Sequence, residues 1–577
     1  MYLRKCRRTK GGNDHVYWQL VESFRTERGP RQHVLAYLGD MGEPLRLGVA
    51  GAAKGSSSSR QEAFLSDGVT PEWVEVDAAH IKVERVLDFG GYWLGLQVMN
   101  RLGLGEFLDS AMDKGKEEVP WSMMATVLVL MRLVDPSSEL RVSEHLFERT
   151  ALGDLLGIPA DKANDDRLYR TLDRIVPHKV ALEKYLKERL GRMFALEYDL
   201  LLYDVTSTYF EGECEGNGQA RHGYSRDRRS DCKQVCIALV VSREGMPLGY
   251  ELFAGNRGDV TTVKEIVEKI EAQYGQADRI WVMDRGMVSE KNLAFLRSGG
   301  RRYIVGAARG QLGQFREQLL DKAGWQSIAV GLDGKLIGSE DGQEWWILCR
   351  SLARGAKEKA MVARFEQRIE QGLAKLAESC RGEKRLGQAV VERRVGALLS
   401  RNSRARSLFK VKVGSREGGG TTVEWEKQED SRKWADLKGG CYLLRTNIAD
   451  GEVEQLWRTY IQLTEAEAAF RIQKSDLRIR PIWHQKGERV SAHILVCFLA
   501  YVVWKTLGKL CQAAGLGDEP RKVLDELEGI KMVDVVLPTR SGVELRRRCL
   551  SQPTRAQAIL LDRLKLRLPR PVAVQEM

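Results

Sequence analysis

The chain has 577 residues, and 91 lysines and arginines against 79 aspartates and glutamates give it a net charge of +12. Apolar residues at 43% and charged residues at 29% exclude wholesale disorder. Ten cysteines are too few for a disulfide scaffold, and the basic first ten residues lack the apolar stretch of a secretory signal. The longest apolar run, residues 494–504, is shorter than the roughly 18 residues that span a bilayer. We therefore expect a soluble, cytoplasmic protein without a membrane partner, whose charge favours a polyanion such as nucleic acid.

The N-terminal part, residues 1–40, is predicted to be a small β-rich module. Strands are expected at 2–8 and 15–24, on either side of a Gly-Gly-Asn-Asp turn at 11–14. Five of the first ten residues are cationic, so this hairpin is either an arm that contacts DNA or an edge strand kept soluble by its charges. Residues 41–70, rich in Gly, Ala and Ser, are predicted to be a flexible linker.

Residues 71–198 are predicted to be helical, because apolar residues recur there at steps of three and four. Such an all-α domain is a candidate for DNA binding, although periodicity itself indicates only packing. After residue 198 the sequence pattern changes to short apolar runs that are typical of strands. Residues 199–306 are expected to follow the order β-β-β-α-β-α-β of an RNase H-like α/β core, with elements at 200–205, 235–241, 246–253, 260–274, 279–283, 289–296 and 303–305.

Residues 307–455 are predicted to interrupt that core as a β-rich insertion domain. Strands are expected at 345–348, 408–413, 421–425 and 441–444, around a charged helix at 357–377. A basic segment between 393 and 412 is either a solvated face or a surface that follows phosphates. Residues 456–510 are predicted to complete the core with a single helix at 459–477 and an apolar helix at 494–507. Residues 511–577 form a basic C-terminal region.

Three carboxylates stand out as candidate metal ligands. Asp204 interrupts an apolar strand, where an ionised group is costly unless it is paired or bound to metal. Asp284 ends the predicted strand at 279–283 and precedes a tight turn. It would lie at the edge of the sheet where ligands collect. Glu467 lies on the predicted helix at 459–477. Two aspartates on neighbouring strands and one helix glutamate would form an all-oxygen site of the kind that Mg²⁺ prefers.

The predicted helix places further polar groups beside Glu467. Steps of seven residues return to within about 20° on a helix, so Tyr460, Glu467 and Lys474 would form one stripe. Arg471 lies one turn beyond Glu467 on nearly the same face. The arrangement suits a metal site with adjacent phosphate contacts, and an ordinary amphipathic surface helix shows the same pattern.

These motifs resemble the DDE transposases of bacterial insertion sequences, in the group with the signature Tyr-x2-Arg-x3-Glu-x6-Lys. Tyr460, Glu467 and Lys474 match the signature in type and spacing, whereas Leu463 occupies the arginine position. The blocks Tyr-Asp-Val-Thr-Ser-Thr at 203–208 and Val-Met-Asp-Arg-Gly-Met at 282–287 resemble those around the first and second aspartates of the group. The residues from Gly223 to Glu251 resemble the strand pair between them.

The resemblance implies a DNA transposase, acting as an endonuclease and in strand transfer, with Asp204, Asp284 and Glu467 holding two Mg²⁺ ions, for which Mn²⁺ is an expected substitute. Tyr460 and Lys474 would contact DNA near the scissile phosphate, and Arg471 is a hypothetical replacement for the missing arginine. The implied partners are the terminal inverted repeats, target DNA and a second copy of the chain, in a bacterial, nucleoid-associated setting. Some relatives form a DNA hairpin and stack a flipped base on a tryptophan of the insertion domain, for which Trp345, Trp346 and Trp434 are candidates.

Two other readings stay open: a catalytically idle DNA-binding protein derived from a transposase, and an RNase H-fold nuclease without strand transfer. The spacing of Cys214, His222, Cys232 and Cys236 fits no standard zinc site, so reduced, unpaired cysteines are expected. The sequence contains neither a phosphate-binding Gly-x4-Gly-Lys-Ser/Thr loop nor a His-Glu-x2-His motif, which argues against ATP-driven or zinc-protease chemistry.

Overall fold

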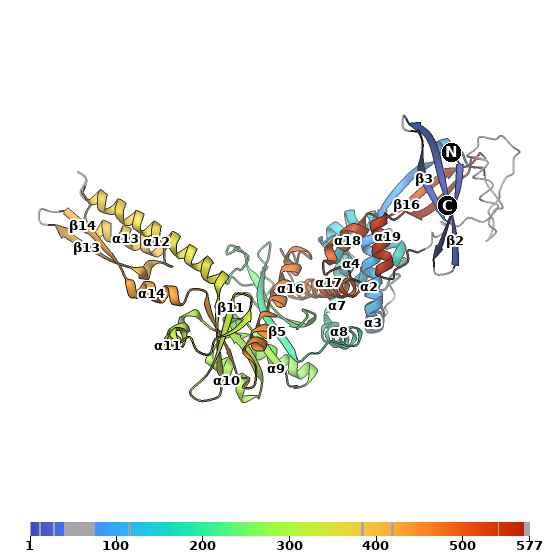
Figure 1. Cartoon of the computed structure of the whole chain (residues 1–577). Coiled ribbons are helices and arrows are strands. Elements are labelled where there is room, and N and C mark those ends of the chain that lie inside the picture. Colours follow the sequence, from blue (N-terminus) through green and yellow to red (C-terminus); the bar gives the residue numbers. More distant parts are fainter. Residues whose placement is uncertain are drawn as a thin grey trace.

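The architecture follows from a computed structural model. It describes residues 2–10, 13–26, 29–39, 75–112, 115, 117–381, 386–416, 420–540 and 542–569, and for the first three ranges the backbone alone. The molecule is elongated and bowed, with a projecting arm at one end, small β-sheets at the other, and a central sheet and a helical part between them (Figure 1). The predicted linker at 41–70 lies outside the described residues.

The N-terminal module is a three-stranded antiparallel sheet. Its strands β1 (Tyr2–Lys10), β2 (Asn13–Thr26) and β3 (Gly29–Gly39) pair in sequence order. The two strands expected from the sequence are therefore present, and β3 is an addition. This strand begins with Gly-Pro, a pair that is typical of turns, so the sequence pattern did not predict it.

A nine-stranded mixed sheet forms the centre of the molecule. Its order is β10-β11-β12-β15-β9-β8-β5-β6-β7, with β5 parallel to β8, β8 parallel to β9, and the other neighbours antiparallel. The predicted β-β-β-α-β-α-β order is confirmed by β5 (Leu200–Tyr209), β6 (Gln234–Ser242), β7 (Pro247–Ala254), α9 (Val263–Tyr274), β8 (Ile280–Met283), α10 (Glu290–Ser298) and β9 (Arg302–Gly306).

Both faces of this sheet are covered, which explains the nearly continuous apolar run of β5. Leu200 and Leu202 join the core on the side of α16 (Thr464–Ser475) and α17 (Gly487–Ala513). Leu201 and Tyr203 point the other way, into a second core beneath α9 and α10. A strand buried on both faces loses the alternation of polar and apolar residues that marks a half-exposed strand.

The helix α17 is a long apolar helix in the core of the molecule. With 27 residues it is long and apolar enough to cross a membrane by length and composition, and 89% of its most apolar window is buried inside the protein. It packs against α4 (Trp121–Val134) and α7 (Asp165–Ile175) on one side and contacts α16 and β7 on others. A helix that is apolar on all sides is typical of such a fully surrounded core position.

The helical part combines segments from both ends of the chain. Its helices include α2 (Gly90–Leu102), α3 (Leu104–Ala111) and α8 (Lys179–Phe194), and α18 (Pro520–Glu528) packs against α2. A small sheet joins β4 (Lys82–Asp88) to β16 (Lys531–Pro538) and β17 (Glu544–Leu550). The sequence indicated neither β4 nor these C-terminal strands. Within the basic triplet of β17, Arg548 pairs with Asp534 at 2.6 Å, so this cation is engaged inside its own sheet.

The contact between α2 and α18 depends on a glycine. A Cβ atom at Gly90 would lie 1.8 Å from the carbonyl oxygen of Leu527, and the Gly90 amide donates to the carbonyl of Ile530 at 2.9 Å. We expect Gly90→Ala to lower the free energy of unfolding by more than about 2 kcal/mol, because backbone must move. Gly105→Ala on α3 is the control, since nothing lies within 4 Å of a Cβ there, and should be neutral or stabilising by up to about 1 kcal/mol. Urea denaturation of both variants checks this, and equal stabilities would contradict it.

The residues between β9 and α15 (Val453–Ile461) contribute to two structures. The strands β10 (Gln326–Ala329), β11 (Leu332–Gly338), β12 (Trp345–Ser351) and β15 (Cys441–Thr446) extend the central sheet. Residues 352–440, which we call the arm, leave and re-enter the sheet between the adjacent strands β12 and β15. The arm contains α12 (Leu352–Arg381), α13 (Gln388–Arg401), β13 (Phe409–Arg416), β14 (Gly420–Lys427) and α14 (Glu429–Leu437), around an apolar core of its own.

Candidate active site

Asp204 and Asp284 lie at the same level of two adjacent parallel strands. The register of β5 and β8 pairs Tyr203 with Met283, and each aspartate is the next residue along its strand. Leu202 and Val282, two residues earlier, both belong to the core on the side of α16. Because side chains alternate along a strand, Asp204 points to the face of the sheet that α16 covers.

Glu467 reaches this edge from α16, which packs against β5. The prediction of one continuous helix at 459–477 is wrong, because α15 ends at Ile461 and α16 begins at Thr464. Between them the amide of Leu463 donates to the carbonyl of Tyr460 at 3.0 Å, a tighter turn than that of an α-helix. Only Glu467 and Lys474 therefore share a helix, and Tyr460 reaches the site from α15.

The three carboxylates influence one another electrostatically. The pKa of Asp204 is raised to about 6, mainly by burial; the charges of Asp284 and Glu467 also raise it, whereas the Val205 amide and Arg226 lower it. Asp284 and Glu467 are exposed, and within the described part of the chain none of the three carboxylates forms an ion pair. The site is thus a cluster of carboxylates at the end of β5 and β8, which the charge of Arg226 offsets only in part.

Tyr460 borders this cluster. Burial raises its pKa, and the charges of Asp284 and Glu467 act in the same direction. A Cβ at Gly306 on β9 would lie 2.6 Å from the Tyr460 hydroxyl, so the absence of a side chain at Gly306 gives the tyrosine its place beside the carboxylates.

Lys474 lies in a second charged group next to the carboxylates. Its Nζ donates to Asp227 at 2.9 Å, and Arg480 pairs with the same aspartate. Burial lowers the pKa of Lys474, Asp227 raises it, and Arg480 and Arg226 lower it. Sequence reasoning did not place Asp227, Arg226 and Arg480 beside Lys474. Asp227 and Arg226 come from a loop about 250 residues earlier, and Arg480 follows α16 in the sequence.

Arg471 and Leu463 differ in exposure. Arg471 is exposed on α16, one turn beyond Glu467. Leu463, at the position of the signature arginine, is only 6% exposed and belongs to the main apolar core. A side chain at position 463 therefore points into the protein, whereas Arg471 points away from it.

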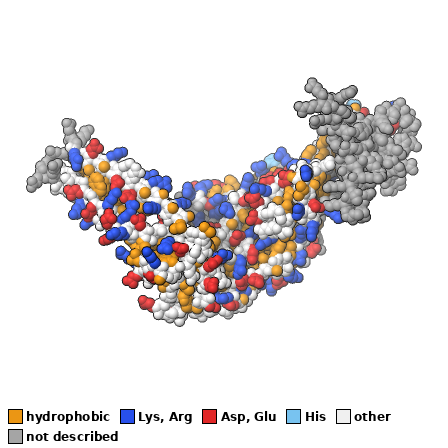
Figure 2. Space-filling model, viewed as in Figure 1, with side chains coloured by type: hydrophobic (Ala, Val, Ile, Leu, Met, Phe, Trp, Pro, Cys, Tyr) orange, Lys and Arg blue, Asp and Glu red, His pale blue; other side chains and the backbone are white. Residues whose placement is uncertain are grey.

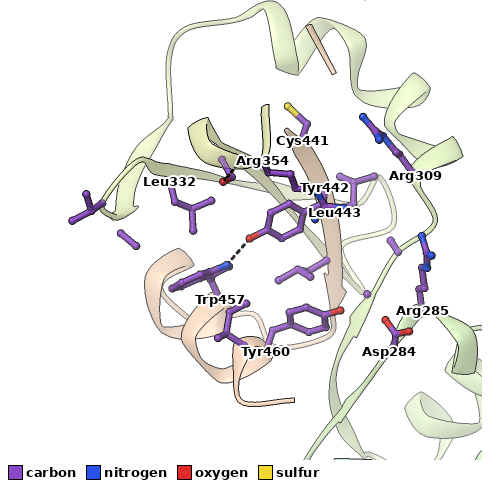
Figure 3. Close-up of a pocket in the computed structure, with 17 residues that line it drawn as sticks. Asp284, Arg285, Arg309, Leu332, Arg354, Cys441, Tyr442, Leu443, Trp457 and Tyr460 are labelled. Atoms are coloured by element: carbon purple, nitrogen blue, oxygen red, sulfur yellow. Dashed lines mark hydrogen bonds between the residues drawn. The ribbon is translucent and has the colours of Figure 1, made fainter. Parts of the chain in front are cut away.

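A cavity of about 620 Å³ opens beside Asp284 and Tyr460 (Figure 3). On the side of the cavity away from Asp284, Nε1 of Trp457 donates a hydrogen bond to the hydroxyl of Tyr442 at 2.7 Å. Its lining also includes three arginines, Arg285, Arg309 and Arg354. The cavity combines aromatic surfaces with cations next to the carboxylates.

The tryptophan candidates lie elsewhere. Trp346 is 9% exposed beneath the guanidinium of Arg445, at 5.1 Å, and Trp434 on α14 lies between two cations. Neither they nor Trp345 line the cavity, whereas Trp457 does. No local pattern pointed to Trp457, because its neighbours Tyr442 and Arg354 come from another strand and another helix.

A different group of potential metal ligands is buried between the helical part and residues 484–493, which include the first residues of α17. It consists of Glu139, His484 and His493. Nδ1 of His493 faces the guanidinium of Arg132 at 3.4 Å, and its Nε2 lies 3.0 Å from the carbonyl of Ile479. Burial and Arg132 lower the pKa of His493 to about 3. Both ring nitrogens are engaged and a cation is adjacent, so this group is better suited to joining the two segments than to holding a second cation.

The cysteines considered for zinc are free, as predicted. Cys214 and Cys236 are buried and Cys232 is half-buried. The Cys236 thiol donates to the carbonyl of Gly255 at 3.7 Å, so it is engaged within the core.

Comparisons with known proteins identify the family of the chain. Residues 196–503, more than half of the chain, match the family model described as the transposase DDE domain, so the protein belongs to the DDE transposase family. Residues 3–62 match the N-terminal domain of IS1634 family transposases, which identifies a transposase of an insertion sequence.

Neither the curated sequences nor the solved structures add detail. No curated protein sequence matches the chain. Among solved structures, a piggyBac transposase synaptic complex with hairpin DNA is similar with 8% identity and a TM-score of 0.36, over 76% of this chain and 78% of that chain. At this TM-score the likeness supports no correspondence between individual residues.

Proposed function

We propose that the protein binds the terminal inverted repeats of its own element as a homodimer, cleaves the element ends in a metal-dependent reaction and joins them to target DNA. The observation that carries this proposal is the convergence of Asp204, Asp284 and Glu467 at one edge of the central sheet. In this proposal β5 to β9 with α9, α10 and α16 form an RNase H-like core, and the arm is inserted into it.

The carboxylates suit a pair of hard divalent cations. Their donor set contains only oxygen, which Mg²⁺ prefers and Mn²⁺ accepts. Burial and, to a smaller extent, the charges of Asp284 and Glu467 raise the pKa of Asp204, and bound cations would favour its ionised form. Asp204, Asp284 and Glu467 would hold these ions, which when bound activate a water or 3′-hydroxyl and stabilise the leaving oxygen in phosphoryl transfer.

The surrounding residues would hold the DNA. Tyr460 would orient the strand beside Asp284, and Lys474, kept in place by Asp227, would approach a neighbouring phosphate. Arg471 would supply the phosphate contact that Leu463 cannot make. These side chains reach the site from two helices, α15 and α16, so DNA would be held by more than one element beside the carboxylates.

Arg471 provides a specific prediction. We expect Arg471→Ala to abolish end cleavage and leave the fold intact, because the side chain is exposed and, within the described residues, forms no ion pair. Arg458→Ala is the matched control, since Arg458 is a 67% exposed arginine on the neighbouring helix α15 that pairs with Glu454. Cleavage of labelled element ends measures the effect. Normal cleavage by the Arg471 variant would show that Arg471 is not part of the active site.

The proposed function is tested with purified protein and labelled DNA from both flanks of its own gene, in Mg²⁺ and in EDTA. We expect metal-dependent cutting at a discrete position in each flank, followed by joining of the cut ends to an unrelated plasmid. Binding without cutting would favour the idle DNA-binding protein instead. Cutting without joining would favour a nuclease.

A further inference from the structure

The arm carries most of the net positive charge of the protein. Residues 352–440 contain 21 lysines and arginines against 12 aspartates and glutamates, a net charge of +9 out of +12 for the whole chain. Lysine and arginine side chains are visible along the arm in Figure 2. A charge imbalance of this size on one projecting element indicates a polyanionic partner for that element.

The cations of α12 are arranged in a line. Lys357, Arg364, Arg368 and Lys375 follow one another at steps of seven, four and seven residues, and all four are exposed. At about 100° per residue these steps keep them within about 40° of one another, over a length of about 27 Å. The stripe therefore runs along the outward face of the helix, parallel to its axis.

Three of the carboxylates of α12, Glu358, Glu366 and Glu370, lie away from the stripe and are already paired. Glu358 pairs with Arg309, and Glu366 and Glu370 both pair with Lys427 of β14. None of the four stripe cations forms an ion pair within the described residues. Between Lys357 and Lys375 the outward face carries no carboxylate, and the first one near it is Glu378, so no carboxylate opposes an anionic partner over most of its length.

The stripe begins next to the cavity of the active site. Arg354, at the start of α12, lines the same cavity as Asp284. Glu358 fixes this end of the helix, because it binds Arg309 and accepts the amide of Gly440 at 3.0 Å. From there α12 leads away from the core towards the tip of the arm (Figure 1).

We propose that the outward face of α12 binds the phosphate backbone of double-stranded DNA next to the cleavage site. This inference rests on the proposed function, to which it adds a DNA-binding surface outside the carboxylate cluster. A length of about 27 Å corresponds to about eight base pairs. Lysine and arginine contacts to phosphates read no sequence, so this surface holds any duplex that adjoins the scissile bond.

The test removes the charges of the stripe together. A variant with Lys357, Arg364, Arg368 and Lys375 all changed to Gln is compared with one in which each Lys is changed to Arg and each Arg to Lys. A third variant, with Lys264, Lys291, Lys322 and Lys522 changed to Gln, loses the same charge from exposed positions elsewhere. Binding of an element-end duplex is measured by fluorescence anisotropy at several salt concentrations.

We expect the stripe variant to lose at least tenfold in affinity at low salt, and its slope of log K against log salt to fall by about 3 to 4 units, since each phosphate contact contributes about 0.9. The other two variants should bind like the wild type. If the wild type cuts element ends and the stripe variant keeps its full slope, the α12 proposal fails alone. If the wild type neither binds nor cuts, the proposed function fails with it. An altered sedimentation of the DNA-free stripe variant, with unchanged DNA binding, would assign the face to a second copy and overturn the proposal.

Discussion

Replacing Asp284 with Asn should abolish DNA cleavage and leave the fold and DNA binding intact. The side chain is exposed, so the fold does not depend on it, whereas it supplies one of three carboxylates at the proposed metal site. Divalent ions contribute several kcal/mol to phosphoryl transfer, so we expect a loss of about 1000-fold or more in the rate of cleavage. Glu467→Gln should have the same effect.

Each of these variants has a matched control nearby. Asp278→Asn changes an exposed aspartate just before β8, which pairs with Arg302 at 2.6 Å. Glu465→Gln changes a glutamate on the same helix as Glu467, which pairs with Lys505 at 3.1 Å. Cleavage assays with Mg²⁺ should show full activity in both controls. Cleavage at the normal rate by the Asp284 or Glu467 variant would contradict the assignment of these carboxylates.

Asp204→Asn should stabilise the protein in EDTA, although it destroys activity. The pKa of Asp204 is raised to about 6, above its ordinary value of 3.8, mainly by burial. The folded protein therefore holds this proton more tightly than the unfolded chain, and its stability falls as the pH rises from about 4 to about 6. Above pH 6 the ionised carboxylate costs about 2–3 kcal/mol, which asparagine avoids.

Urea denaturation in EDTA between pH 4 and pH 8 measures this effect. The variant should be more stable than the wild type at pH 7.5, and the difference should vanish near pH 4. Adding Mg²⁺ should reverse the order, because bound ions stabilise only the protein that retains all three carboxylates. A variant that is less stable than the wild type at pH 7.5 in EDTA would show that burial of the ionised Asp204 carboxylate does not destabilise the fold.

The sequence predicted the core well where a local pattern determines the structure. The apolar run that contains Asp204 is β5, and the strand that ends before Asp284 is β8, with both aspartates at matching positions of parallel strands. The expected strands and charged helix at 345–444 are also present. The roles of the carboxylates, Tyr460, Lys474 and Arg471 stay predictions.

The missed features depend on contacts between distant parts of the chain. The break between α15 and α16 occurs because Leu463 turns into the core, which a helical apolar pattern does not reveal. The pairing of β4 with β16 joins residues more than 400 positions apart. Lys474 meets Asp227 only because α16 packs across the sheet beside the loop before β6. None of these contacts leaves a local signal in the sequence.

The most direct test of the metal site uses Fe²⁺ in place of Mg²⁺, with ascorbate and peroxide. Hydroxyl radicals formed at a bound iron cut the polypeptide close to its ligands, and mass spectrometry identifies the new ends. If Asp204, Asp284 and Glu467 hold the divalent ions, cuts should appear near residues 204, 284 and 467 and should be suppressed by excess Mg²⁺. Cuts near Glu139, His484 and His493, or cuts that Mg²⁺ does not suppress, would contradict the proposed site.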